Sequence, residues 1–212
     1  MTPLLLVAGA VVGVGAAVAT GARDARIASL GLVSLLVMAP FVADPLPEPV
    51  PLAFGVVAGI LAGFLVHVAA RRAPDSAPPT LGLPATIGAA AAGFAAGIGA
   101  TAVALPRLGP DAALAAGFAA LAVAVGPIAI TRDLFRFGSA LIVLVAAGFL
   151  VLTALAGTPP PLTGIAAGIL LVALAAAVAV VGGGAVALGG TSGPDAELDR
   201  RAAAIRARSD RR

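Results

Sequence analysis

The sequence contains no Lys, Asn, Gln, Cys, Trp or Tyr, and it has a single His. Without Cys the chain can form no disulfide, thiol nucleophile or thiolate metal site, and the composition gives no clue to the redox compartment. Without Lys it cannot form a retinal Schiff base, which needs a side-chain amine. It also lacks the amides and aromatic hydroxyls that sites for sugars or amino acids often use. These absences exclude a retinal protein and disfavour transport of polar solutes.

Charge is scarce as well, because only 11% of the residues are charged while 60% are hydrophobic. Soluble domains average about 25% charged and about 45–50% apolar residues, so this chain cannot cover itself with polar surface in water. We therefore predict an integral membrane protein with the lipid bilayer as its solvent. The formal net charge is only +3 and most loops carry few Arg, so we expect no nucleic-acid partner.

Ala, Gly and Pro are abundant, and Arg is the only strong base. This composition is typical of a GC-rich prokaryotic genome, such as that of a haloarchaeon or an actinobacterium. The expected location is therefore the plasma membrane of such a cell. No basic residue precedes the first apolar run, unlike in a signal peptide, so we expect that run to be retained as a helix.

Seven apolar runs of 17 to 27 residues follow one another along the chain. At 1.5 Å per residue, each can cross a hydrocarbon core of about 30 Å as a helix. We predict an all-α, polytopic seven-transmembrane-helix bundle in one domain, residues 1–188, followed by a basic cytoplasmic tail, residues 189–212. The predicted spans are residues 3–20, 27–43, 50–70, 83–105, 111–130, 137–156 and 162–188.

Two spans and the tail contain residues that affect where their helices begin and end. The second span is short and contains Pro40, while the seventh contains three consecutive glycines, 182–184. The seventh helix therefore either ends near Val181 or continues towards the tail. In the tail, Pro194 precedes acidic residues and then several Arg, an order that complements a helix dipole. We expect a short, weakly amphipathic helix there.

The distribution of Arg predicts how the helices are oriented. If the loops alternate between two compartments, 12 of the 13 Arg fall on one side and Arg107 alone falls on the other. Short cytoplasmic loops are the ones enriched in basic residues. We therefore expect the N-terminus outside and the C-terminus in the cytoplasm, and the asymmetry supports the count of seven spans.

His67 follows a ladder of glycines in the third span, Gly55, Gly59 and Gly63. A spacing of four residues places all of them on one helix face, and overlapping GxxxG steps let another helix approach closely. Two interpretations of His67 stay open. It is either a polar site that responds to pH or contacts a substrate, or an interfacial His that is hydrogen-bonded to a neighbour.

The fourth span carries a similar ladder with Gly93 and Gly97. We interpret both ladders as helix-packing faces within the chain, with a homo-oligomer seam as the alternative. Hydroxyl side chains near the predicted cytoplasmic ends are likewise open to two interpretations, a shallow polar cavity or ordinary bonding to the helix backbone. They are Thr20, Ser29, Ser34, Thr86 and Ser139.

Short sequence matches suggest an internal repeat. The string AGFLV occurs at 62–66 and again at 147–151, and the glycine pattern of the first span recurs in the fourth. If spans 1–3 correspond to spans 4–6, the second unit crosses the membrane in the opposite direction, as in many secondary transporters. The alternative is coincidence in a chain rich in Ala, Gly, Leu and Val.

The predicted spans contain no Glu or Arg, and their one Asp is Asp111, at the very start of the fifth span, so few side chains are available for catalysis. A protease needs a Ser–His or paired Asp arrangement, and a metal or haem site needs several ligands. We therefore expect no enzyme, no catalytic residue, no cofactor and no metal. The preferred interpretation is a structural or accessory subunit that packs against other membrane-protein subunits through small-residue helix faces. The alternative is a secondary transporter or permease for an apolar or lipid-like substrate, built from the inverted repeat plus one helix.

Overall fold

A computed structural model describes residues 3–43, 46–72, 82–104, 111–131, 133–157 and 160–187. These residues form seven α-helices and one short 3-10 helix, which continues the second α-helix. They give seven helical segments long and apolar enough to cross a membrane, the second of which is Ala25–Val42 and includes the 3-10 helix. This agrees with the all-helical fold expected from the sequence and is compatible with a multi-pass membrane protein. The helices are α1 (Pro3–Gly21), α2 (Ala25–Met38), η1 (Ala39–Val42), α3 (Pro49–Arg72), α4 (Leu83–Ala104), α5 (Asp111–Ile130), α6 (Leu134–Ala156) and α7 (Pro161–Ala187).

Several helix ends differ from the predicted spans, and local chemistry accounts for most of the differences. The second span is divided at Met38, because the Pro40 ring has no N–H to continue the helix, and the chain tightens into η1. Both α2 and α6 begin earlier than predicted. Asp24 caps α2 by accepting the Arg26 N–H at 2.8 Å, and Asp133 caps α6 by accepting the Phe135 N–H at 2.9 Å. At the other end of the chain, α7 passes through its three glycines to Ala187, and the expected tail helix lies outside the described residues.

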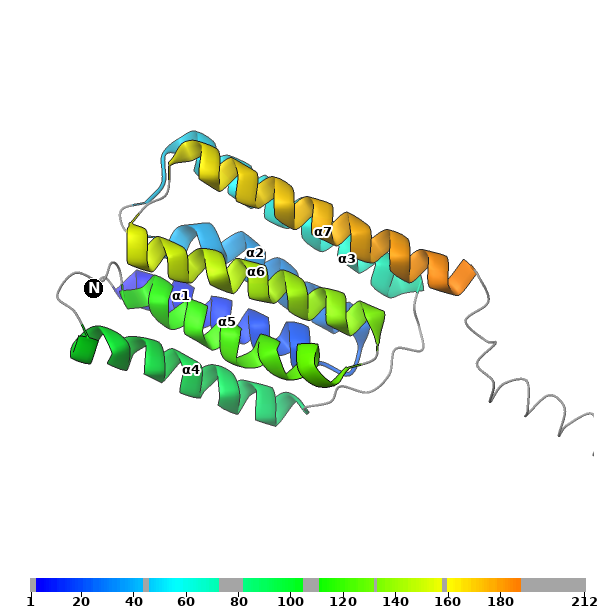
Figure 1. The fold of residues 1–212 in the computed structure, drawn as a ribbon, viewed down its shortest axis with the longest axis horizontal. Helices are drawn as coiled ribbons and strands as arrows, with labels where there is room; N and C mark the ends of the chain where they lie inside the picture. Colours follow the sequence, from blue (N-terminus) through cyan, green and yellow to red (C-terminus); the bar gives the residue numbers. More distant parts are fainter. Residues whose placement is uncertain are drawn as a thin grey trace, which may run out of the picture.

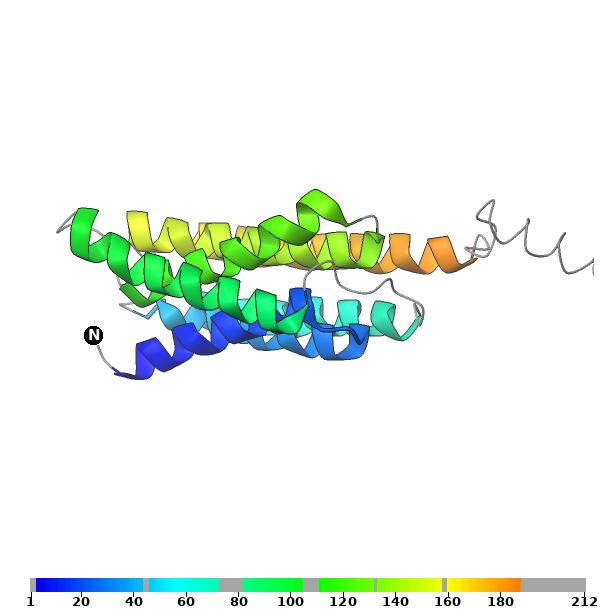
Figure 2. The same ribbon diagram turned by 90° about the horizontal axis from the view of Figure 1, so that it is seen from below.

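The helices form two layers with one helix covering an edge (Figures 1 and 2). Helices α1, α2 and α3 make one layer, and α5, α6 and α7 make the other. Helix α4 packs on α5 and α1 at one edge, while α3 and α7 pack closely at the opposite edge. Between these edges, α2 and α3 make little contact with α6. The layers are therefore joined mainly along their edges.

The two ends of the bundle differ in composition. Arg23, Arg26, Arg71 and Arg136 lie where α1 and α3 end and where α2 and α6 begin, and we call this the arginine end. The opposite end carries residues 39–43, 46–51 and 160–161, which are rich in proline, and we call it the proline end. Helices α3 and α7 both begin at the proline end and therefore run parallel.

The buried interior is built mainly from small residues. Most of the buried apolar side chains are Ala, whereas many larger ones are exposed, such as Leu4, Val50, Leu162 and Val180. In water such an arrangement would leave much apolar surface uncovered. In lipid it is ordinary, because helix association there depends on close backbone approach rather than on hiding large apolar groups.

The helix contacts between spans 1–3 and spans 4–6 do not follow the inverted repeat that the matching strings suggest. In such a repeat α1 corresponds to α4 and α2 corresponds to α5. Because α1 packs on α5, the repeat requires α4 to pack on α2 in the same way. Helix α4 makes no such extended contact with α2 within the described residues. The observed pairs across the layers are instead α1 with α5 and α3 with α7. The packing corresponds within the two sets of three helices, since α1–α2–α3 and α4–α5–α6 each pack in series, but it does not correspond between the sets.

Candidate functional site

The glycine ladder of α3 faces the end of α2 and the short helix η1. A Cβ atom added at Gly59 would lie 2.9 Å from the Leu36 carbonyl oxygen, and one at Gly55 would lie 3.1 Å from the Pro40 Cγ. At Gly63 an added Cβ would overlap the Val33 side chain. The ladder therefore allows α3 to approach the backbone of α2.

The ladder of α4 faces α5 in the same way. A Cβ atom at Gly93 would lie 2.6 Å from the Phe118 carbonyl oxygen, and one at Gly97 would lie 2.5 Å from the Ala115 Cα. These contacts are with backbone atoms, which no side-chain rotation can relieve. Both ladders therefore face partners within the chain, and a seam between copies would require another face.

His67 lies at the arginine end, one turn after Gly63, within a chain of hydrogen bonds. Its Nε2 accepts from the Arg71 Nε at 3.1 Å, and its Nδ1 lies 2.8 Å from the Ser29 Oγ. Because Nε2 is an acceptor here, the neutral ring carries its proton on Nδ1 and donates to Ser29. The Ser29 hydroxyl in turn donates to the Arg26 carbonyl at 2.7 Å. His67 therefore links α3 to α2, as one of the two interpretations of this residue anticipates.

Arg136 is a candidate functional residue that the sequence analysis assigned to a loop, just before the predicted span 137–156. It lies in the first turn of α6 and is only 7% exposed. Its guanidinium donates to the Ala22 carbonyl at 3.1 Å and to the Arg23 carbonyl at 3.2 Å, and its Nε lies 3.8 Å from the Asp133 carboxylate. The expectation that the helices carry no Arg is therefore wrong. The capping residue Asp133 is the sequence signal that could have extended α6 over it.

The bonds of Arg136 join the two layers at the arginine end. Its donors lie on α6, in one layer, and the two acceptor carbonyls follow the end of α1, in the other. Those carbonyls lie at the negative end of the α1 dipole, where a cation is favoured. This is a charged tie between the layers at one end of the bundle.

The hydroxyl groups near this end bond to the backbone of their own helices. Thr20 donates to the Ala16 carbonyl at 3.0 Å, Thr86 to Leu83 at 2.9 Å and Ser139 to Phe135 at 2.9 Å. The interpretation as backbone-bonded hydroxyls is therefore confirmed for these three residues. Because their protons are donated to backbone carbonyls, these three side chains do not support the alternative interpretation of a shallow polar cavity at this end.

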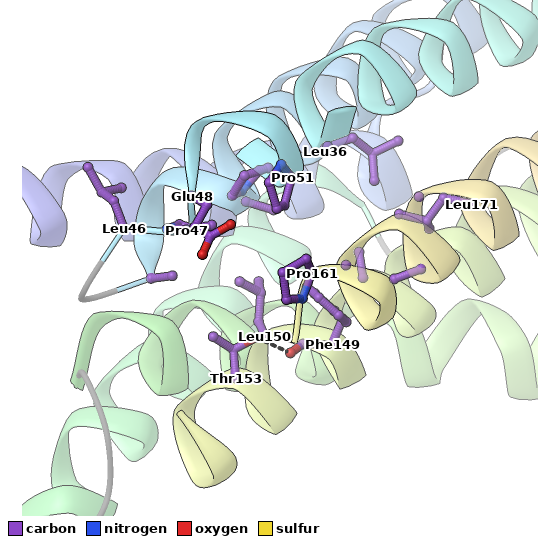
Figure 3. Close-up of a pocket in the computed structure, with 18 of the residues that line it drawn as sticks. Leu36, Leu46, Pro47, Glu48, Pro51, Phe149, Leu150, Thr153, Pro161 and Leu171 are labelled. Carbon is purple, nitrogen blue, oxygen red and sulfur yellow. Dashed lines mark hydrogen bonds between the residues drawn. The ribbon is translucent and has the colours of Figure 1, made fainter. Parts of the chain in front are cut away.

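A cavity of about 320 Å³ lies instead at the proline end, between α2, η1 and α3 on one side and α6 and α7 on the other (Figure 3). This volume is at the lower end of the range of ligand pockets, about 300–1,000 Å³. Its walls are largely apolar, with Leu36, Leu150 and Leu171 among the larger side chains. No sequence pattern predicts this cavity, because it arises where the middle helices of the two layers, α2 and α6, part.

Two polar side chains line the described part of this cavity. Thr153, on α6, is buried and donates its hydroxyl proton to the Phe149 carbonyl at 2.8 Å. Glu48, just before α3, is exposed at the proline end, and Figure 3 shows it beside Pro47 and Pro51. The cavity thus combines a long apolar wall with one carboxylate. Such a lining suits an amphiphilic molecule better than a sugar or a metal ion.

Comparison with known proteins found no matching family model, no matching curated protein and no matching solved structure.

Proposed function

We propose that the chain is a seven-span integral membrane protein with its proline end outside the cell and its arginine end in the cytoplasm. Large apolar side chains exposed around the bundle support insertion in lipid. The concentration of Arg at one end supports the orientation, since basic residues favour the cytoplasmic side. In this orientation the cavity faces the outer side.

We further propose that the protein is a permease for a lipid-like, amphiphilic molecule, without catalytic chemistry or a cofactor. The observation that supports this is the apolar cavity between the two layers. A wholly apolar solute crosses a bilayer unaided, but a charged headgroup at the bilayer centre costs at least about 2.5 kcal/mol. A protein that shelters the headgroup between its layers lowers this cost.

The contacts at the arginine end support a gating step in this proposal. The layers part at the proline end, while Arg136 ties them at the arginine end. Breaking that tie and closing the cavity would expose the same space to the cytoplasm, a rearrangement of the kind that carriers make on microsecond to millisecond timescales. The observed arrangement then corresponds to the outward-facing state.

A lipid-scrambling measurement tests the proposal. The purified protein is reconstituted in liposomes that contain a short-chain lipid with a dithionite-sensitive headgroup dye, and dithionite is added outside. We expect reduction of dye from both leaflets with the wild-type protein, and from the outer leaflet alone with Ala167→Phe, which fills the cavity from α7. The matched control is Ala166→Phe, an exposed neighbour outside the cavity lining, which should behave as wild type. Reduction confined to the outer leaflet with wild-type protein would refute the permease.

A different observation favours an accessory subunit as the second candidate. The exposed face of α4 carries small residues, Gly88, Ala92, Ala95 and Gly99, at spacings that place them on one side of the helix. A side chain added at Gly88 or Gly99 would meet nothing within 4 Å. Small residues facing outward allow another transmembrane helix to approach closely. A partner subunit or a second copy would cover this face.

Crosslinking tests the subunit candidate, because the chain has no native Cys. A single cysteine from Ala95→Cys should form a specific adduct in native membranes, either with a stoichiometric partner or with another copy. A cysteine from Val180→Cys, exposed on α7, serves as the control. Equal, non-specific adducts from both positions would argue against the subunit.

A further inference from the structure

The cavity mouth is poor in hydrogen-bond donors, although two helices begin there. Proline occupies positions 49 and 51 in the first turn of α3 and positions 160 and 161 at the start of α7, and proline has no N–H. The Leu52 N–H donates to the Glu48 carbonyl, and the Thr163 and Gly164 N–H groups donate to the Pro160 carbonyl. The positive charge of a helix N-terminus resides on its free N–H groups. An anionic headgroup would therefore find little to bind at this mouth.

Glu48 is the ionisable side chain that lines the described part of the cavity, and as a carboxylate it favours a cationic headgroup over an anionic one. The Glu48 carboxylate is exposed at the mouth, and it makes no hydrogen bond or ion pair with the described residues. Deeper in the cavity, the walls are apolar and the Thr153 hydroxyl proton is already donated to Phe149. The carboxylate is therefore the cavity's main polar anchor, and it attracts positive charge.

We propose that the cavity recognises a monocationic amphiphile, with its amine or quaternary ammonium group beside Glu48 and its apolar body along Leu36, Leu150 and Leu171. This rests on the proposed function and names its class of substrate. The charge pattern discriminates against fatty acids and other anionic amphiphiles of the same length. Because Glu48 is exposed, its preference for a cation is modest, about two- to fivefold in affinity.

A set of brominated probes tests the headgroup preference directly. The chain has no Trp, so Phe149→Trp in the cavity wall gives a single fluorescent reporter that bromine quenches on contact. The probes are 10-bromodecyl-trimethylammonium, 10-bromodecanol and 11-bromoundecanoate, titrated into the reporter protein in phosphatidylcholine nanodiscs. They have similar chains and differ chiefly in charge, so they compare a cation, a neutral group and an anion.

The comparison between Glu48 variants removes differences in how the probes partition into lipid. We expect Glu48→Gln, in the reporter background, to weaken quenching by the cation about two- to fivefold and to leave quenching by the alcohol unchanged. Ala167→Phe should abolish saturable quenching by all three probes, whereas Ala166→Phe should not change it.

The two proposals fail in different ways. If the cation and the alcohol quench saturably but Glu48→Gln affects neither, the headgroup preference is refuted while the amphiphile cavity remains. If Ala167→Phe leaves quenching by every probe as it was, the probes reach the reporter from the lipid. In that case both the cationic substrate and the cavity's role in transport are refuted.

Discussion

Replacement of Gly97 by Ala tests how the fourth helix is held against the fifth. An added Cβ would lie 2.5 Å from the Ala115 Cα and 2.9 Å from both the Ala115 N and the Leu114 carbonyl oxygen. Ordinary van der Waals contact begins at about 3.4 Å, so the two helices must move apart by about 1 Å. All three contacts are with backbone atoms, and therefore no change of rotamer can absorb the methyl group.

The expected cost follows from two opposing effects. Overpacking at a close contact destabilises by about 1–3 kcal/mol. Ala is favoured over Gly within a helix by about 0.5–1 kcal/mol, which offsets part of this cost. We therefore expect Gly97→Ala to lower the free energy of unfolding by about 1–2 kcal/mol.

Gly99 supplies the matched control on the same helix. It is exposed, and an added Cβ would meet nothing within 4 Å. Gly99→Ala therefore has only the helix-propensity effect and should be neutral or stabilising by up to about 1 kcal/mol. The assay is reversible unfolding in mixed micelles with increasing dodecyl sulfate, followed by circular dichroism. A Gly97→Ala protein at least as stable as Gly99→Ala would show that α4 does not approach α5 as closely as described.

Three further predictions concern the orientation of the bundle and the contacts at its arginine end. In whole cells, a membrane-impermeant maleimide should label a cysteine from Leu46→Cys but not one from Arg23→Cys until the cells are lysed; the reverse pattern would invert the orientation. Arg136→Met should lower stability by about 2–4 kcal/mol, since it removes two charge-assisted bonds and leaves two carbonyls without this donor, and unchanged unfolding would contradict the tie between layers. His67→Ala and Ser29→Ala should each cost about 1 kcal/mol, with the double variant costing clearly less than their sum. Strict additivity in that cycle would argue against the bond between them.

Much of the helical structure was accessible from the sequence, because it depends on local properties. Long apolar runs separated by Pro and charged residues predict helices that the structure places with similar bounds. The prediction failed where a single side chain decides a helix end, as with the Asp133 cap and the Pro40 ring. The error of three residues at the start of α6 had a large effect, because it left Arg136 in a predicted loop, whereas the structure places Arg136 in the first turn of the helix.

The candidate site was much less accessible. The spacing of Gly93 and Gly97 places them on one face by helix geometry alone, but it does not say which helix lies opposite. The Ser29–His67 bond joins residues 38 apart, and the Arg136–Ala22 bond joins residues 114 apart. Neither partner carries a sequence pattern that identifies the other.

The sequence by itself determined that the chain forms seven apolar helices and that Arg23, Arg26, Arg71 and Arg136 lie near their ends on one side of the bundle. Only the tertiary structure decided that α3 lies beside α7, that α2 and α6 part to leave a cavity and that Arg136 joins the layers opposite it. The reason is physical. Helix formation and hydropathy follow from neighbours along the chain, whereas pairing between helices that are apolar on every side depends on how their surfaces fit.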